Sequence, residues 1–290
     1  MLTIENLSKT YPNGVQALRG IDLEIPRGLF GLLGPNGAGK SSLMRTLATL
    51  QDADCGRATL DTLDVLNDKQ AVRRILGYLP QDFGLYPRID ALTLLDHFAE
   101  LKGVADRGER TDTVEALLRL TNLWDVRRQK LGTFSGGMRQ RFGIAQALIG
   151  QPQLIIVDEP TTGLDPEERR RFLNLLARIG EDAVVILSTH LVADVRELCP
   201  TMAVIQKGRV LVRGTPEGLI TELDGRVWRR AIDGGDLDRL ADGATILSTH
   251  LVAGQSVVRV ACDGRPGADF TPVAANLEDV YFSTLRAASA

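Results

Sequence analysis

A glycine-rich stretch at residues 34–42 constrains this chain more than any other segment. It reads GPNGAGKSS and directly follows the apolar run LFGLL. It fits the pattern G-x-x-x-x-G-K-[ST], set between a strand and a helix. Glycines let the backbone turn tightly, so that several N–H groups and the start of the next helix point toward one anion. The stretch predicts a loop that binds the phosphates of a nucleotide; a glycine-rich turn before an ordinary helix is the alternative.

Two side chains of this loop suit a nucleoside triphosphate and its metal ion. Lys40 can bring a full positive charge to the β and γ phosphates, and the hydroxyl of Ser41 is placed to bind Mg²⁺. ATP and Mg²⁺ are therefore the expected cofactors. The expected nucleotide contacts in the loop are Gly34, Pro35, Asn36, Gly37, Ala38, Gly39, Lys40, Ser41 and Ser42.

A second segment places two carboxylates at the end of a strand. Residues 153–158 read QLIIVD, a run too short for a helix and apolar on both faces, as in a central parallel strand. Asp158 and Glu159 then emerge at the carboxyl edge of the sheet, where ligands of open α/β sheets bind. We expect Asp158 to hold Mg²⁺ through water, opposite Ser41. Glu159 is expected to orient or deprotonate the attacking water.

Three more residues are expected at the same site. His190 follows an apolar strand at 183–187 and can reach the γ phosphate, while Gln81 follows a strand at 75–79 and can sense the metal or the water. Tyr11 lies in a turn where its ring can stack on the base, with ordinary packing as the alternative. The predicted catalytic residues are Glu159, His190, Gln81 and Lys40, and the predicted metal ligands are Ser41, Gln81 and Asp158.

The apolar periodicity predicts an α/β fold. It is a P-loop NTPase core over residues 1–220, with a helical subdomain inserted at about 88–150 and a small α+β C-terminal domain at 221–290. Within the last part we expect strands at 226–232, 244–251 and 256–261 and helices at 236–240 and 276–285. The string ILSTHLVA occurs at 186–193 and again at 246–253, but no acidic strand end or phosphate loop accompanies the second copy. We therefore assign His250, and also His97, to surface or packing roles.

The composition limits partners and location. The net charge is −3 and no long basic run occurs, so no nucleic-acid partner is expected. The three cysteines lie far apart, which indicates a reducing compartment rather than a disulfide framework or a zinc site. Neither a signal peptide nor an apolar run of about 20 residues is apparent. Any role at a membrane would require another chain to supply the spans.

Residues 134–138 identify the family that this chain resembles. They read FSGGM, and RQRFGIAQAL follows. This is similar to the signature of ATP-binding cassette (ABC) ATPases, with Phe134 and Met138 where that family usually has Leu and Gln. The other motifs of the family follow in its order over residues 1–218: Tyr11 resembles the adenine-stacking aromatic, Gln81 the Q-loop, 154–159 the Walker B strand, 163–166 the D-loop and His190 the switch histidine.

The resemblance implies a head-to-tail dimer, expected to be a homodimer. In it each ATP lies between the phosphate loop of one subunit and Ser135, Gly136 and Gly137 of the other. A helix expected to begin near Met138 would make these residues a second helix start that binds an anion. One such start alone does not enclose a nucleotide, so the site is expected to need a second subunit.

Membrane transport is the leading functional hypothesis. The chain would be the ATPase subunit of a transporter, cytoplasmic and peripheral on the inner face of the membrane through a separate permease. Residues 81–87, the SGGMRQR segment and residues 277–281 resemble ATPases of multidrug-type exporters, which favours export over import. Soluble cassette ATPases are the competitors; however, Lys40 and Ser135 are only 95 positions apart, with no coiled coil between them, and the chain holds one cassette. A sensor without turnover would lack Glu159 or His190.

Overall fold

The computed structural model describes residues 1–161, 164–179, 182–232 and 244–288. Its strands are β1 Leu2–Thr10, β2 Gln16–Ile25, β3 Gly28–Leu33, β4 Cys55–Leu60, β5 Leu63–Asp64, β6 Leu76–Leu79, β7 Leu154–Asp158, β8 Val184–Thr189, β9 Thr201–Gln206, β10 Arg209–Gly214, β11 Val227–Ile232, β12 Thr245–Val252, β13 Gln255–Ala261 and β14 Thr271–Pro272. Its helices are α1 Lys40–Leu47, α2 Lys69–Ile75, α3 Ala91–Leu101, α4 Arg107–Leu120, α5 Gly136–Ala147, α6 Pro166–Ile179, α7 Val192–Leu198, α8 Pro216–Thr221 and α9 Leu277–Ala287, with 3₁₀ turns at Trp124–Val126 and Leu131–Thr133.

The central sheet has six strands in the order β10-β9-β3-β8-β7-β6. All neighbouring strands run parallel except β10, which pairs antiparallel with β9. Strand β7 shows why the apolar run predicted a central position: Leu154 and Ile156 pack on one face of the sheet, and Ile155 and Val157 on the other. Both faces of this sheet are therefore covered, and the polar ends of β7 and β8 lie together at one edge.

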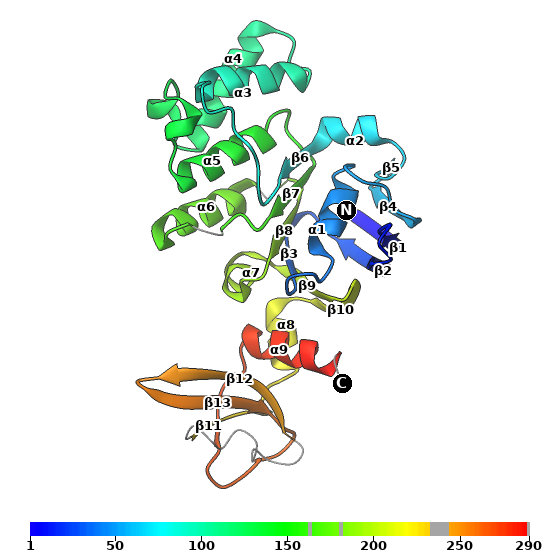
Figure 1. Ribbon diagram of the computed structural model, residues 1–290, viewed down its shortest axis with the longest axis vertical. Helices are drawn as coiled ribbons and strands as arrows, with labels where there is room; N and C mark the ends of the chain where they lie inside the picture. The colour runs from blue at the N-terminus through cyan, green and yellow to red at the C-terminus, as the bar shows by residue number, and fades with distance from the viewer. Residues whose placement is uncertain (162–163, 180–181, 233–243, 289–290) are drawn as a thin grey trace.

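Different elements cover the two faces (Figure 1). On one face, helix α1 lies in a common apolar core with the antiparallel sheet β2-β1-β4-β5. On the other face, α6, α7 and α9 contribute to a second core. Helices α3, α4 and α5 build a third core of their own beside the sheet, at the place predicted for the helical subdomain.

The C-terminal part forms a sheet in the order β12-β13-β11-β14, from which helix α9 returns to the core around the central sheet (Figure 1). Leu277, Val280 and Tyr281 of α9 belong to the same apolar cluster as Val192 and Val195 of α7. Strands β11, β12 and β13 and the last helix occur where the sequence predicted them, whereas β14 was not predicted. The expected helix at 236–240 lies outside the described residues, and the domain boundary at 220/221 stays a prediction.

Several element ends differ from the sequence prediction. The helical spacing of Leu43, Met44, Leu47 and Leu50 predicts a helix through Leu50, but α1 ends at Leu47 because Thr49 adopts a left-handed φ of 61°. Ile75 ends helix α2 rather than beginning a strand, and β8 continues to Thr189. Helix α5 begins at Gly136, two residues earlier than expected, because the Ser135 side chain caps it by accepting a hydrogen bond from the backbone N–H of Met138 at 3.2 Å.

Candidate nucleotide-binding and catalytic site

The loop between β3 and α1 is held by contacts that only glycine permits. Gly39 has φ 109°, and a Cβ there would lie 2.5 Å from the carbonyl oxygen of Ala17 on β2. On another side, Gly208 in the β9–β10 turn donates its N–H to the Ala38 carbonyl at 2.8 Å and accepts from the N–H of Arg19 at 2.8 Å. Strand β2 and the β9–β10 hairpin thus fix the loop from two directions.

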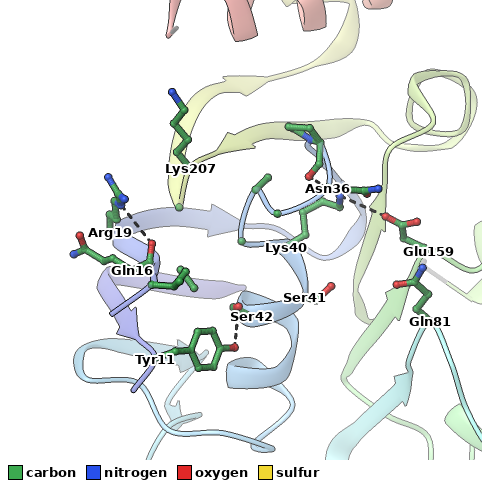
Figure 2. A pocket seen from close by; sticks show the side chains of 17 residues that line it. Tyr11, Gln16, Arg19, Asn36, Lys40, Ser41, Ser42, Gln81, Glu159 and Lys207 are labelled. Atoms are coloured by element: carbon green, nitrogen blue, oxygen red, sulfur yellow. Dashed lines mark hydrogen bonds and ion pairs between the residues drawn. The ribbon is translucent and has the colours of Figure 1, made fainter. Parts of the chain in front are cut away.

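A cavity of about 600 Å³ opens at this loop (Figure 2). It is lined by Tyr11, Val15, Gln16, Ala17, Arg19, Pro35, Asn36, Gly37, Ala38, Gly39, Lys40, Ser41, Ser42, Gln81, Glu159, Lys207 and Gly208. The fold therefore gathers the loop, Tyr11, Gln81 and Glu159 around one space. Gly34, Asp158 and His190 do not line it, although Gly34 and His190 contact residues that do.

The Glu159 carboxylate contacts two other side chains of the site, one with each oxygen. Its Oε1 is 3.4 Å from Lys40 Nζ, and its Oε2 is 3.0 Å from His190 Nδ1. Lys40 also donates to the carbonyl oxygen of Gly34 at 2.6 Å. Lys40 and Glu159 are both buried, where unpaired charges are costly, while His190 is partly exposed. The arrangement brings the phosphate-loop lysine, the carboxylate at the strand end and the histidine of the next strand together, as the sheet-edge argument predicted.

The backbone of Glu159 is itself constrained. Its φ is 48°, a left-handed conformation that costs a non-glycine residue about 1–2 kcal/mol. Its N–H donates to the Ser188 carbonyl at 2.8 Å, which ties the end of β7 to β8. In this conformation the Glu159 carboxylate contacts both Lys40 and His190. Residues held in such conformations often occur at functional sites.

Asp158 has the chemistry of a cation ligand. It is buried at the end of β7, and its Oδ1 has no hydrogen-bond partner within the described part of the chain. A buried carboxylate oxygen without a donor is unfavourable unless a cation compensates it. Oxygen donors are what Mg²⁺ prefers, and Ser41 and Gln81 offer further oxygens at the cavity. The residues present therefore fit a magnesium ion.

Tyr11 lies at one end of the cavity (Figure 2). Its hydroxyl is 3.0 Å from Ser42 Oγ and donates to Gln51 Oε1 at 3.0 Å. The hydroxyl thus anchors the half-buried ring to helix α1 and to the segment that follows it. Its role in stacking on a base stays a prediction.

The signature residues lie away from this cavity. Ser135 and Gly136 are exposed at the start of α5, and a Cβ on Gly136 would meet no atom within 4 Å. Gly137, in contrast, is buried, with Glu168 Oε2 only 2.5 Å from the place of its Cβ. None of the three lines the cavity. Within one chain, the signature and the phosphate loop do not form a joint site.

The sequence reasoning missed the rim of the cavity formed by β2 and the β9–β10 turn. The residues that line this rim are Gln16, Arg19, Lys207 and Gly208, the last two in the β9–β10 turn. The positive φ of both turn residues, 49° and 76°, agrees with that turn. Nothing in the local sequence shows that the turn meets the phosphate loop, because the two are far apart along the chain.

Comparisons with known proteins agree on the family. The family profile described as "ABC transporter" matches residues 18–162. The daunorubicin/doxorubicin resistance ATP-binding protein DrrA of Streptomyces peucetius is 36% identical over 247 residues, which cover 84% of this chain and 74% of that protein. The chain belongs to the ABC transporter family, and the predicted recognition is confirmed.

Other relatives differ in length from this chain. The probable multidrug ABC transporter ATP-binding protein YbhF of Escherichia coli (strain K12) is 34% identical over 78% of this chain, but the match spans only 39% of YbhF. Among solved structures, the dimeric post-hydrolysis state of the ATP-binding cassette MJ0796 bound to ADP and Pi has a TM-score of 0.68 at 26% identity, covering 74% of this chain and 98% of that one. The predicted fold class, an α/β fold with a P-loop NTPase core, is thereby confirmed. Within the described residues, no helix is both long and apolar enough to cross a bilayer.

Proposed function

We propose that this chain is the ATP-hydrolysing subunit that powers a membrane transporter, with export as the direction. The contacts of Glu159 with Lys40 and His190 beside the phosphate loop carry the proposal. They bring a phosphate-binding cation, a general base and a histidine together at one edge of the sheet. The names of YbhF and DrrA, which include multidrug and drug resistance, favour export. An importer subunit or a soluble cassette ATPase is the alternative.

In this proposal ATP occupies the 600 Å³ cavity. The base stacks on the ring of Tyr11, and the phosphates lie on the N–H groups of the loop and at the start of α1. Lys40 is in direct contact with Glu159, so a phosphate that binds Lys40 competes with that carboxylate. Binding would therefore release Glu159 from one of its two partners at the moment when substrate arrives.

The metal site of the proposal uses Ser41, Asp158 and Gln81. When bound, Mg²⁺ neutralises charge on the β and γ phosphates. Oδ1 of Asp158 supports this assignment, since no described residue donates a hydrogen bond to it. Gln81 lies beyond the end of β6 and lines the cavity together with Glu159, so it can hold the attacking water or the metal shell.

Glu159 is proposed as the general base. Its carboxylate would accept the proton of the attacking water, and His190 would orient that carboxylate through the contact of 3.0 Å. His190 lies just beyond the end of β8, where it can also contact the γ phosphate. Lys40 stabilises the charge that develops on the transferred phosphoryl group.

We infer that the active form is a head-to-tail homodimer. Ser135 and Gly136 are exposed on a capped helix start, away from their own chain's cavity, which suits contact with a nucleotide held by another subunit. The similar cassette MJ0796 is a dimer in its structure with ADP and Pi. A symmetric pair would complete two equal sites.

A separate permease is the second proposed partner, and it would hold the chain at the inner face of the membrane. A cavity of about 430 Å³ lies where the core meets the helical subdomain, lined by residues that include Tyr78, Phe98 and Lys102. Leu50 and Leu101 on its rim are 61% and 70% exposed. Exposed apolar side chains around a groove often mark protein contacts. Movement of the helical subdomain would pass through this groove to the permease.

The variant Glu159→Gln tests the assignment of the base. It removes the proton acceptor and keeps the shape, so ATP binding should persist, an ATP-bound dimer should accumulate, and turnover should fall by about 100-fold or more. Phosphate release and size-exclusion chromatography with ATP measure these effects. Glu167→Gln, at an exposed residue of α6, is the control and should match wild type. Hydrolysis near the normal rate in Glu159→Gln would show that another group is the base.

Purification from membranes tests the partner. A membrane protein that co-purifies with the chain in a fixed ratio is the expected result. A soluble or ribosomal partner instead would favour the soluble cassette ATPases.

A further inference from the structure

A fully buried carboxylate lies outside the site described above. Asp194 of helix α7 has an exposed fraction of 0% and comes four residues after His190. Burying a charge of this kind is strongly unfavourable unless it is paired and hydrogen-bonded. The groups that pair with Asp194 therefore indicate its role in the structure.

Both oxygens of Asp194 are occupied by groups from other segments. Oδ2 accepts a hydrogen bond from Thr161 Oγ1 at 2.8 Å. Oδ1 accepts from Arg169 Nε at 2.7 Å and lies 2.5 Å from Arg169 Nη2. A guanidinium that contacts a buried carboxylate by two nitrogens makes a strong and directional pair.

The three residues come from the segments that carry the proposed catalysis. Thr161 comes two residues after Glu159, and Asp194 lies on the helix that follows His190. Arg169 lies in the first turn of α6, where its N–H donates to the carbonyl of Asp165. One carboxylate thus joins the segment after β7, the segment after β8 and the start of α6.

The hydrogen bonds of Asp194 affect the contact between Glu159 and His190. Glu159 is held at φ 48°, and the N–H bond to Ser188 O is its backbone tie to β8. The bond from Thr161 to Asp194 is a second tie between the same two segments, on the far side of Glu159. With both ties present, the peptide that contains Glu159 cannot relax without breaking a buried hydrogen bond.

We propose that Asp194 is a positioning residue for the Glu159–His190 pair, acting through Thr161 and Arg169. The inference rests on the proposed role of Glu159 in hydrolysis. None of its three residues lines the nucleotide cavity, so they act on the geometry of the pair and not on ATP binding.

A purely structural role has to be distinguished from positioning. Burial, and next the negative charge of Asp194, raise the pKa of the neighbouring Cys199 to about 12. The carboxylate therefore lies in a poorly solvated core, and its loss is expected to lower stability too. For variants that are fully folded, the division of the effect between kcat and KM, together with rescue by a conservative variant, separates the two roles.

Thr161→Val tests the inference because it removes the hydroxyl and keeps the shape of the side chain. For full-length chain in its dimeric form, we expect kcat for ATP hydrolysis to fall by about 10- to 100-fold, as for small misplacements of catalytic groups. KM for ATP should stay unchanged, and Thr161→Ser should restore kcat. Arg171→Ala, which removes an exposed ion pair of α6, is the control and should match wild type. Thermal unfolding fixes a temperature at which every variant is folded.

Asp194→Asn is the second variant, and it decides the question where Thr161→Val does not fold. It removes the charge toward Arg169 and should lower kcat with KM unchanged. Wild-type kcat in folded Thr161→Val or Asp194→Asn would overturn the inference, and so would equal losses in Thr161→Val and Thr161→Ser. A wild-type chain that hydrolyses no ATP would instead overturn the proposed function.

Discussion

At the scale of single residues, Tyr11 combines two groups with different partners. Its hydroxyl bonds to Ser42 and Gln51, whereas its ring lines the nucleotide cavity. Tyr11→Phe keeps the ring, so the Kd for ATP should change little. Tyr11→Ala removes a stacking contact worth about 1–3 kcal/mol, which raises the Kd by about 5- to 150-fold. Titration calorimetry measures both variants, and an equal loss in the two would show that the hydroxyl, and not stacking, supports binding.

The sequence predicts the identity of most residues at this site but not their contacts. Lys40 and Glu159 are predicted because each belongs to a motif that ends a strand or begins a helix. The contact between Glu159 and His190 depends on the left-handed φ of Glu159, and no local pattern indicates that conformation. Arg19 and Lys207 were missed because their place at the cavity results from packing between distant strands.

At the scale of elements, the signature helix α5 offers two adjacent glycines with opposite surroundings. A methyl group on Gly137 would meet Glu168 Oε2 at 2.5 Å, whereas one on Gly136 would meet nothing within 4 Å. Gly137→Ala should therefore displace the flexible end of the Glu168 side chain from Arg141, which offsets the helix preference of alanine and leaves this variant less stable than Gly136→Ala. Gly136→Ala should leave the free energy of unfolding unchanged or raise it by up to about 1 kcal/mol, because alanine favours helix. Thermal unfolding of the two variants measures this difference.

The same pair of variants also tests the dimer. Gly136 is exposed where the partner's nucleotide is proposed to bind, so Gly136→Ala in the Glu159→Gln background should reduce the ATP-bound dimer. Size-exclusion chromatography gives the dimer fraction. An intact dimer in that variant would place the partner's nucleotide elsewhere.

Whether the sequence predicts a helix or strand depends on whether local residues or tertiary contacts stabilise it. Strand β7 carries its own signal because both of its faces are apolar. Helices α2, α7 and α8 are six or seven residues long and were not predicted. Helices this short are not stable alone, so they form only through tertiary packing such as that of Val192 and Val195 against α9.

At the scale of the whole molecule, the C-terminal part contributes to the apolar core that covers the central sheet. Its sheet has a small apolar cluster of its own around Val258 and Val260. Helix α9, however, buries Leu277, Val280 and Tyr281 in the cluster that covers the central sheet. Apolar periodicity predicted a small α+β unit, but the return of α9 is a contact between distant segments that periodicity cannot reveal.

Removal of the residues after 222 shows whether the C-terminal part affects ATP binding, stability or both. Every residue that lines the nucleotide cavity precedes residue 222, so the Kd for ATP should stay unchanged. Loss of α9 uncovers α7 and exposes apolar surface, and each buried side chain of this size contributes about 1.5–3 kcal/mol. The truncated chain should therefore bind ATP normally and unfold at a lower temperature. Calorimetric titration and thermal unfolding measure the two effects.

A second, shorter truncation tests whether α9 is the element responsible for the loss of stability. Removal of residues 276–290 takes away α9 and keeps the C-terminal sheet, and it should lower the unfolding temperature almost as much as the longer deletion. Val280→Ala in the full chain creates a cavity in the same cluster and should destabilise by about 1–3 kcal/mol, with ATP binding intact. Loss of ATP binding in a folded truncated chain would refute the two-domain organisation. An unchanged unfolding temperature would show instead that α9 only rests on the ATPase core, because the apolar contacts with α7 would then contribute no stability.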